Sequence, residues 1–249
     1  MSENPAPSRI IVSLRSGLAL AAANIVCAGI IAWAWMHIRQ SDQTVQVTGS
    51  ATVRIQSDLI VWRGTVTARA DELAEAYRRL KESVAAAAEF VKARGVPPPE
   101  LTIGAVRTTT QYERDANGRE TPKITGYALS QTLGVTSADV ARIEELSRSA
   151  TELIEQDILF DSQAPEFMYT KLADLKIKML AEATKDATLR AEQICTNSGS
   201  RLGALRSARM GVMQIAPAHS TEVSDYGMND TSSFEKDVRA VVTATFAVK

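Results

Sequence analysis

The sequence predicts an α+β protein in which an N-terminal transmembrane helix precedes antiparallel sheets packed against long helices. Three observations predict this class. Residues 17–38 contain no Asp, Glu, Lys or Arg. Several later segments alternate apolar and polar residues, as strands with one buried face do. Between them lie long segments with apolar residues at three- and four-residue steps, which is the spacing of an amphipathic helix.

The N-terminal apolar run has the length of a membrane span. A helix over residues 17–38 would be about 33 Å long, close to a hydrocarbon core of about 30 Å. Trp33 and Trp35 stand at its C-terminal end, where indole rings favour the headgroup layer. Arg9 and Arg15 precede it and favour a cytoplasmic N-terminus. We therefore expect a single-pass signal anchor in the cytoplasmic (inner) membrane, with the following body facing the periplasm or the cell exterior.

A cleaved signal peptide is the alternative for the same run. Ala32-Trp33-Ala34 fits a small-x-small cleavage site, and the preceding arginines would form the basic region. Against cleavage, the run is longer than the usual apolar region of about 7–15 residues and continues past that site. The anchor is therefore favoured, with residues 1–43 as tail and anchor and residues 44–249 as one extracytoplasmic α+β domain.

The first elements of the body are two strands, followed by a helix. Residues 45–55 and 59–70 are rich in β-branched residues, and the first segment alternates strictly. Ser57-Asp58 lies between them, so we expect the two strands to pair as a hairpin. Residues 73–91 have apolar residues on one helical face, and Gly95 followed by prolines at 97–99 ends that helix.

The remaining elements continue the same pattern. Asp139 or Ser137 caps a helix that reaches about residue 152. Pro165 precedes the longest helix, residues 166–197, which has alanines along one side. Residues 217–233 are polar and rich in turn residues, so we expect a mobile loop. Further strands are expected at about residues 101–112, 124–136, 158–160, 204–215 and 238–248.

The ordered series of segments resembles a known family. The series includes VQVTGSATV, SDLIVWRGTVTARADELAEAY, VKARGVPPPELTIGAVRTTTQYE and a closing TATFAVK. In these segments residues 44–249 resemble the SIMPL-domain family of bacterial envelope proteins, which includes periplasmic immunogenic antigens. The resemblance implies a SIMPL-like α+β envelope domain that forms homo-oligomers, some of them rings. It implies no catalytic residue. The links of the family to stress resistance are associational.

Composition and charge argue against a nucleic-acid partner. The chain has 28 Lys+Arg and 29 Asp+Glu, and the first 40 residues take three arginines and one glutamate, which leaves 25 basic and 28 acidic residues. This charge balance gives no electrostatic case for nucleic-acid binding, which needs a clustered positive face. The cysteines, Cys27 and Cys195, leave the body with a single thiol, so no disulfide can form within it.

The search for catalytic or metal-binding residues is negative. His37 lies in the apolar run, so His219 is the one histidine available as a base, and it lies in the expected loop. The acidic residues Glu222, Asp225 and Asp230 lack the spacing of a calcium loop. We therefore predict no enzyme, no catalytic residue, no cofactor and no metal. Trp62, Tyr112 and Tyr127 could line a ligand groove, although core packing is the simpler expectation.

Two functions remain. The first is a non-enzymatic, membrane-anchored envelope protein that self-assembles through its SIMPL-like domain, with the envelope or stress-related roles that the resemblance implies. Its partners would be the membrane, through residues 17–38, and further copies of the chain. At least one of the first and last strands is expected at a sheet edge, unless residues such as Arg54 and Arg239 cover it. The alternative is a small-molecule or lipid-binding periplasmic protein, which needs a pocket of about 300–1,000 Å³.

Overall fold

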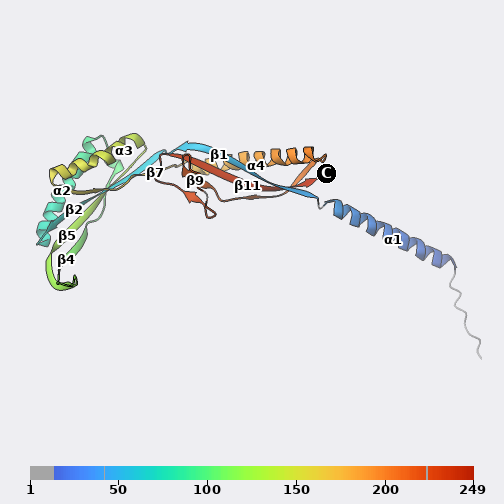
Figure 1. Cartoon of the computed structure of the whole chain (residues 1–249), viewed down its shortest axis with the longest axis horizontal. Coiled ribbons are helices and arrows are strands. Elements are labelled where there is room, and N and C mark those ends of the chain that lie inside the picture. Colours follow the sequence, from blue (N-terminus) through green and yellow to red (C-terminus); the bar gives the residue numbers. More distant parts are fainter. Residues whose placement is uncertain (1–13, 42, 223) are drawn as a thin grey trace, which may run out of the picture. The chain divides into compact units, whose positions relative to one another are not determined.

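A computed structural model describes residues 14–41, 43–222 and 224–249 (Figure 1). The predicted tail with Arg9 lies outside these residues, and so do the side chains of Arg15, His37 and Arg39. The helices are α1 (Leu14–Ser41), α2 (Leu73–Ala93), α3 (Val140–Ser149) and α4 (Leu172–Asn197), with short 3-10 helices η1 (Pro98–Glu100) and η2 (Ala150–Gln156). The strands are β1 (Thr44–Gln56), β2 (Leu59–Ala70), β3 (Leu101–Ile103), β4 (Arg107–Arg114), β5 (Glu120–Ser137), β6 (Leu159–Ser162), β7 (Glu166–Met168), β8 (Leu202–Met210), β9 (Gln214–Pro217), β10 (Met228–Asn229) and β11 (Glu235–Val248).

The helix α1 includes the predicted span, residues 17–38, within its bounds. Its apolar side chains Leu20, Ile25 and Ile31 are exposed. Within the part of the chain that the structure describes, no helix meets the length and hydropathy needed to cross a membrane.

The strands form two sheets, and the predicted α+β class with mainly antiparallel sheets is confirmed. The six-stranded sheet has the order β3-β5-β2-β6, with β4 also pairing with β5 and β7 with β2. All of its pairs are antiparallel. The five-stranded sheet has the order β1-β11-β9-β10, with β8 also pairing with β11. In this sheet β10 runs parallel to β9.

The prediction that the first two strands form a hairpin is wrong. β1 belongs to the five-stranded sheet and pairs with β11, whereas β2 belongs to the six-stranded sheet and pairs with β5, β6 and β7. The alternation of β1 predicted its buried face, but it carries no information about the partner strand. The partner of β1 lies almost at the other end of the sequence, so no local turn signal could identify it.

Two compact units divide the chain, and four elements, β1, α4, β8 and β11, contribute residues to both. The first unit comprises the described residues of Met1–Gly49, together with Lys185–Arg209 and Val242–Lys249. The second unit comprises Ser50–Thr184 and Met210–Val241.

The largest core of the second unit lies between the six-stranded sheet and the helices α2 and α3 (Figure 1). Trp62 of β2 is fully buried in this core, and its ring centroid lies 6.0 Å from that of Phe160. Its indole Nε1 donates to the Ser162 hydroxyl at 3.1 Å. A Cβ on Gly64 would lie 2.1 Å from the ring of Phe160, so this position allows Phe160 to cover the strand closely. Trp62 is thus a core residue, which confirms the simpler expectation of core packing.

Some predicted helix bounds differ from those of the structure. The long helix α4 begins at Leu172 rather than at residue 166, because residues 166–168 form β7 and pair with β2. The Thr170 backbone N–H and hydroxyl then donate to the Asp58 carboxylate at 2.7 and 2.9 Å. Asp139 caps α3 as predicted, accepting from the Arg142 backbone N–H.

The segment at residues 217–233, expected to be a loop, contains the short strand β10 and is tied to its surroundings in its described part. The Gln214 side chain donates to the Ser224 carbonyl at 2.6 Å and accepts from the Ser224 N–H at 3.3 Å. Asp230 accepts from the Ser232 backbone N–H and hydroxyl at 2.9 and 2.7 Å. Lys236 is 1% exposed, and its ammonium lies 3.2 Å from the Asp230 carboxylate and also donates to the Asp230 carbonyl. We call this contact the Lys236–Asp230 pair.

Two carboxylates give the second unit an expected acid sensitivity. Burial raises the pKa of Asp230, but hydrogen bonds from Ser232, Ser233 and Lys236 outweigh burial and lower this pKa to about 2. Hydrogen bonds from Arg54 and from the His219 N–H lower the pKa of Asp237 to about 2. Because both values lie below the unfolded value of about 3.9, the stabilisation is present above about pH 4 and is lost as the pH falls towards about 2.

Urea unfolding at a series of pH values between about 6 and about 2.5 measures this loss. The unfolding midpoint should fall steadily below about pH 4, and Asp230→Asn should make that fall shallower. A midpoint that is independent of pH in this range would contradict the prediction.

Candidate interaction surface

The first unit contains strand residues from β1, β8 and β11, and β1 and β8 form its two free sheet edges. β1 stands at the end of its sheet, and β8 pairs only with β11, so among the described residues neither strand has a second neighbour on its outer side. The expectation that the first or last strand would lie at an edge is confirmed for β1. The last strand, β11, is interior because β1 lies on one side of it and β8 and β9 on the other.

The backbone groups that point outward follow from the hydrogen bonds to β11. Val248 N–H donates to the Gln43 carbonyl at 2.8 Å, and Arg201 and Lys249 exchange both N–H to C=O bonds, at 2.7 and 2.8 Å. Because inward and outward groups alternate along an antiparallel strand, the N–H groups of Gln46 and Thr48 on β1 face its free edge. By the same alternation, the N–H of Ala204 faces the free edge of β8.

A groove lies beside the free edge of β1. Its volume is about 530 Å³, and we call it the edge groove. Leu189 and Ile194 of α4 are 52% and 49% exposed and give it an apolar wall. Its full lining is Gln46, Val47 and Thr48 from β1 with Leu189, Arg190, Gln193 and Ile194 from α4.

The walls of the edge groove are fixed by packing and by an ion pair. Val47 is buried in a cluster with Ala187 and Ala191, whose small side chains let α4 lie close to the strands, as its alanine-rich side predicts. Arg190 is held along the helix, since its Nε lies 2.9 Å from the Asp186 carboxylate. The groove therefore has an apolar floor and wall beside a row of unpaired backbone groups.

β8 also packs closely against β11. A Cβ on Gly203 would lie 2.8 Å from the Ala247 carbonyl oxygen, so the glycine permits the close approach of the two strands. Leu202 packs against the same buried cluster as Val47, which assigns it to the α4 side of the sheet. The next residues on that side are Ala204 and Arg206, whereas Leu205 lies on the opposite face and is 49% exposed.

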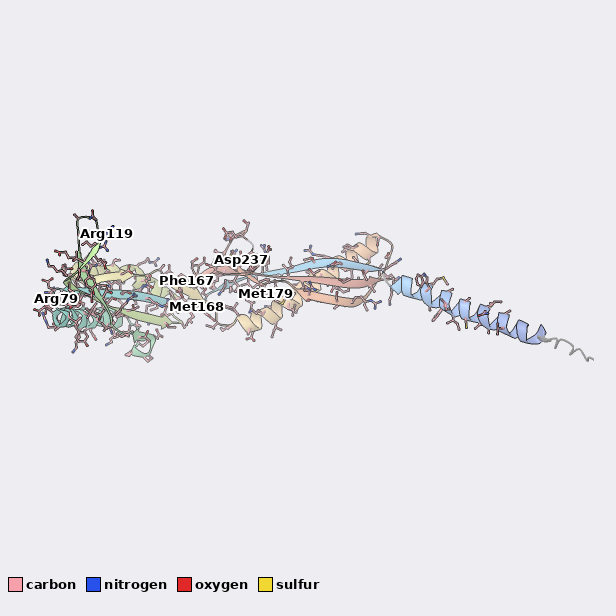
Figure 2. The ribbon with its side chains drawn as sticks, turned by 90° about the horizontal axis from the view of Figure 1, so that it is seen from below. Arg79, Arg119, Phe167, Met168, Met179 and Asp237 are labelled. Carbon is pink, nitrogen blue, oxygen red and sulfur yellow. The ribbon has the colours of Figure 1, made fainter. Side chains whose placement is uncertain are left out.

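The arginines that were candidates to cover a strand edge do not do so. Arg54 of β1 makes a bidentate pair with Asp237 of β11, which Figure 2 labels: Nε donates to Oδ1 at 2.9 Å and Nη2 donates to Oδ2 at 3.0 Å. This places the guanidinium on the face of the sheet. Arg239 lies on the interior strand β11. Both residues belong to the second unit, so the outer edge of residues 44–49 has no charged residue of its own strand.

His219 and Cys195 are not brought together as a catalytic pair in the described structure. The His219 ring contacts the Arg54 guanidinium, with Nε2 3.1 Å from Nη1, and the His219 N–H donates to Asp237 at 3.0 Å. Cys195 is buried in α4, whereas Cys27 is exposed on α1. Within the described ranges, no group of three or more His, Cys, Asp or Glu could hold a metal ion.

The aromatic residues considered for a ligand groove, Trp62, Tyr112 and Tyr127, are not among the residues that line the edge groove or the cleft near the start of α2. Tyr127 packs against the core that contains Trp62, and Tyr112 is exposed on β4. A cleft of about 600 Å³ does lie at the start of α2, but Arg69, Asp71, Glu72, Glu75 and Arg79 are among its lining (Figure 2 labels Arg79). Hydrogen bonds from Arg79 and Arg78 lower the pKa of Glu75, so this cleft is lined by ion pairs rather than by the apolar walls that a lipid needs.

Comparison with known proteins identifies the family. A family model described as SIMPL, a protein of unknown function (DUF541), matches residues 45–246. The chain belongs to the SIMPL family. This confirms the resemblance seen in the sequence, and the match includes both β1 and β8.

Two further proteins are similar to this chain. Uncharacterized protein YggE of Edwardsiella ictaluri (strain 93-146) is 24% identical over 179 residues, which cover 72% of this chain and 72% of that protein. A crystal structure of an uncharacterized conserved protein from Listeria innocua covers 77% of this chain and 91% of its own, at 13% identity and a TM-score of 0.19. Both proteins are described as uncharacterized, and neither description names an activity.

Sequence reasoning identified β1 but missed the edge groove and the edge of β8. Residues 204–215 were expected to form one strand, whereas the structure has β8 at Leu202–Met210 and β9 at Gln214–Pro217. Nothing in the pattern of these residues distinguishes an edge strand from a central one. The exposure of β8 on both faces is the useful signal, and the sequence shows it only as the mixture of small, apolar and basic residues in LGALRSARM.

Proposed function

We propose that this SIMPL-family chain is a non-enzymatic, membrane-anchored envelope module that self-assembles through the free strand edges of its first unit. The observation that carries the proposal is that β1 and β8 both lack an outer neighbour among the described residues. A free edge offers N–H and C=O groups to a further strand. Natural proteins usually protect such edges with Lys, Pro or bulges, and residues 44–49, TVQVTG, contain neither Lys nor Pro.

The proposed anchor is α1, which would hold the chain in the cytoplasmic membrane with the sheets facing the periplasm or the cell exterior. The uncharged residues 17–38 and the exposed Leu20, Ile25 and Ile31 support it, because exposed apolar side chains are stable in lipid rather than in water. Molecules held in one membrane plane also meet at a raised effective concentration, which favours assembly.

Small-molecule or lipid binding is a second candidate, supported by the edge groove. Its volume of about 530 Å³ lies within the range of about 300–1,000 Å³ typical of ligand sites. A groove that runs beside unpaired backbone groups is better suited to an extended peptide strand, whose main chain can pair while its side chains enter the groove. Assembly is therefore the function that this geometry supports best.

Light scattering of the full-length chain in detergent, corrected for bound detergent, tests the proposal. The wild-type chain should have a mass that is a multiple of the protomer mass at micromolar concentration. Ala204→Pro should reduce it to that of a monomer, because proline removes the outward N–H of β8 and leaves the bonds to β11 intact. Ala204→Ser is the matched control, since it keeps this N–H and a small side chain and should remain assembled.

Two results would contradict this proposal, each in a different way. A wild-type chain that is monomeric under these conditions would remove the assembly proposal. If Ala204→Pro remains folded and fully assembled, the β8 edge is not the interface and α1 becomes the candidate for self-association.

A further inference from the structure

We propose that copies of the chain join head to tail, with the free edge of β8 in one copy pairing in parallel with the free edge of β1 in the next. This inference rests on the proposed self-assembly and names the two surfaces and their direction. The occupant of the edge groove is then the β8 strand of a second copy.

The relative direction of the two edges follows from their pairing with β11. From Gln43 to Thr48, the partner on β11 moves back from Val248 to Thr243. From Arg201 to Gly211, the partner on β11 moves back from Lys249 to Val241. Both strands are therefore antiparallel to β11, so β1 and β8 are parallel to each other. Copies that share one orientation can form a continuous sheet in which each β8 lies beside the next β1.

The alternative of pairing β8 with β8 is disfavoured by charge. β8 contains Arg206 and Arg209 and no acidic residue. A two-fold axis would make the strands antiparallel and bring together two copies of Arg206 on one face of the sheet and two copies of Arg209 on the other, and like charges opposite each other on neighbouring strands are destabilising. In the head-to-tail arrangement the neighbouring segment of β1, residues 44–49, carries no charge, and Arg190 of the edge groove is already paired with Asp186.

The alternative of pairing β1 with β1 conflicts with a shared membrane. A two-fold pair over residues 44–49 would place the two Thr44 residues at opposite ends, roughly 17 Å apart along the strands. The chain from Ser41 to Thr44 can span at most about 11 Å. With the strands along the membrane normal, the two α1 helices would leave in opposite directions and could not enter one bilayer. Parallel pairing of β8 with β1 keeps every α1 on the same side.

The side chains also fit this arrangement. Ala204 lies on the α4 side of β8 and is small enough to let the strand approach the edge groove beside Leu189 and Ile194. Leu205 lies on the other face, which is also the face of Thr48. Because β1 and β8 are different surfaces, a row of copies keeps one unused edge at each of its two ends until it closes into a ring, which is the property of a heterologous interface.

Cross-linking in membranes tests the pairing directly. Two differently tagged full-length chains, both carrying Cys27→Ser, are co-expressed, one with Thr48→Cys and the other with Leu205→Cys. A short bismaleimide reagent should link the two tags. Each variant expressed alone should give no dimer above background. Thr109→Cys, on the exposed strand β4 of the six-stranded sheet, is the matched control and should not link to Thr48→Cys.

Each other outcome has a defined meaning. Dimers of Thr48→Cys alone, or of Leu205→Cys alone, would show a two-fold contact and overturn the head-to-tail proposal. An assembly of the expected mass that gives no mixed product would overturn it as well. In both cases self-assembly itself stands, whereas a monomeric mass in light scattering would defeat the proposed function.

Discussion

Replacing Lys236 by alanine is expected to destabilise the second unit by about 3–5 kcal/mol, because one partner of a buried ion pair is removed. The Lys236 side chain is 2% exposed and that of Asp230 is 7% exposed. Without the ammonium, the Asp230 carboxylate and carbonyl lose a donor that water cannot readily replace. The space left by four methylene groups adds a cavity to this cost.

Urea unfolding of the full-length chain in detergent near neutral pH, followed by far-UV circular dichroism, measures this effect. The double variant Lys236→Met with Asp230→Asn is the informative control, because it removes both charges and keeps the volume of each side chain. It should lose less stability than Lys236→Ala alone. A loss below about 1 kcal/mol for Lys236→Ala would show that water replaces the ammonium and that the Lys236–Asp230 pair is not a stabilising contact.

Replacing Trp62 by alanine is expected to cost about 3–5 kcal/mol, the usual range for removing a fully buried large aromatic side chain. Trp62 is 0% exposed and packs against Phe160 between the six-stranded sheet and the helices. The substitution also removes the donor to Ser162, whose own hydroxyl donates to the Ser147 carbonyl at 2.9 Å. The loss therefore combines lost apolar burial, a cavity and a broken side-chain network.

Trp62→Phe separates these contributions. It keeps an aromatic ring but removes the indole N–H, so its cost should be clearly smaller than that of Trp62→Ala. Unfolding midpoints of the two variants, compared under the same conditions as for Lys236→Ala, provide the measurement. Equal losses for both would mean that the hydrogen bond to Ser162, rather than the buried volume, dominates.

Local sequence patterns determined the elements and most of their buried faces. The alternation in β1 correctly places Val47 and Ile55 on the buried face, because successive side chains of a strand point to opposite sides. The alanines of α4 correctly predict a side that packs closely against strands. Such features depend on neighbours within a few residues, so they can be read from one sequence.

The helix α2 shows the limit of that reading. Leu80, Val84, Ala87 and Val91 are buried as their spacing predicts, but Leu73 and Tyr77 on the same predicted face are exposed. Periodicity assigns residues to a face of the helix. How far the sheet extends beneath that face depends on packing with residues outside the helix, so the helix sequence alone cannot predict it.

The sequence by itself determined the α+β class, the SIMPL resemblance and the apolar N-terminal segment. Only the tertiary structure decided that β1 pairs with β11 instead of β2, and that β8 remains at an edge beside it. The physical reason is that a strand offers the same backbone N–H and C=O groups to any partner. Which partner it takes depends on burial and packing between residues that are far apart in the chain, so the free edges, and with them the candidate interaction surface, become visible only in the folded protein.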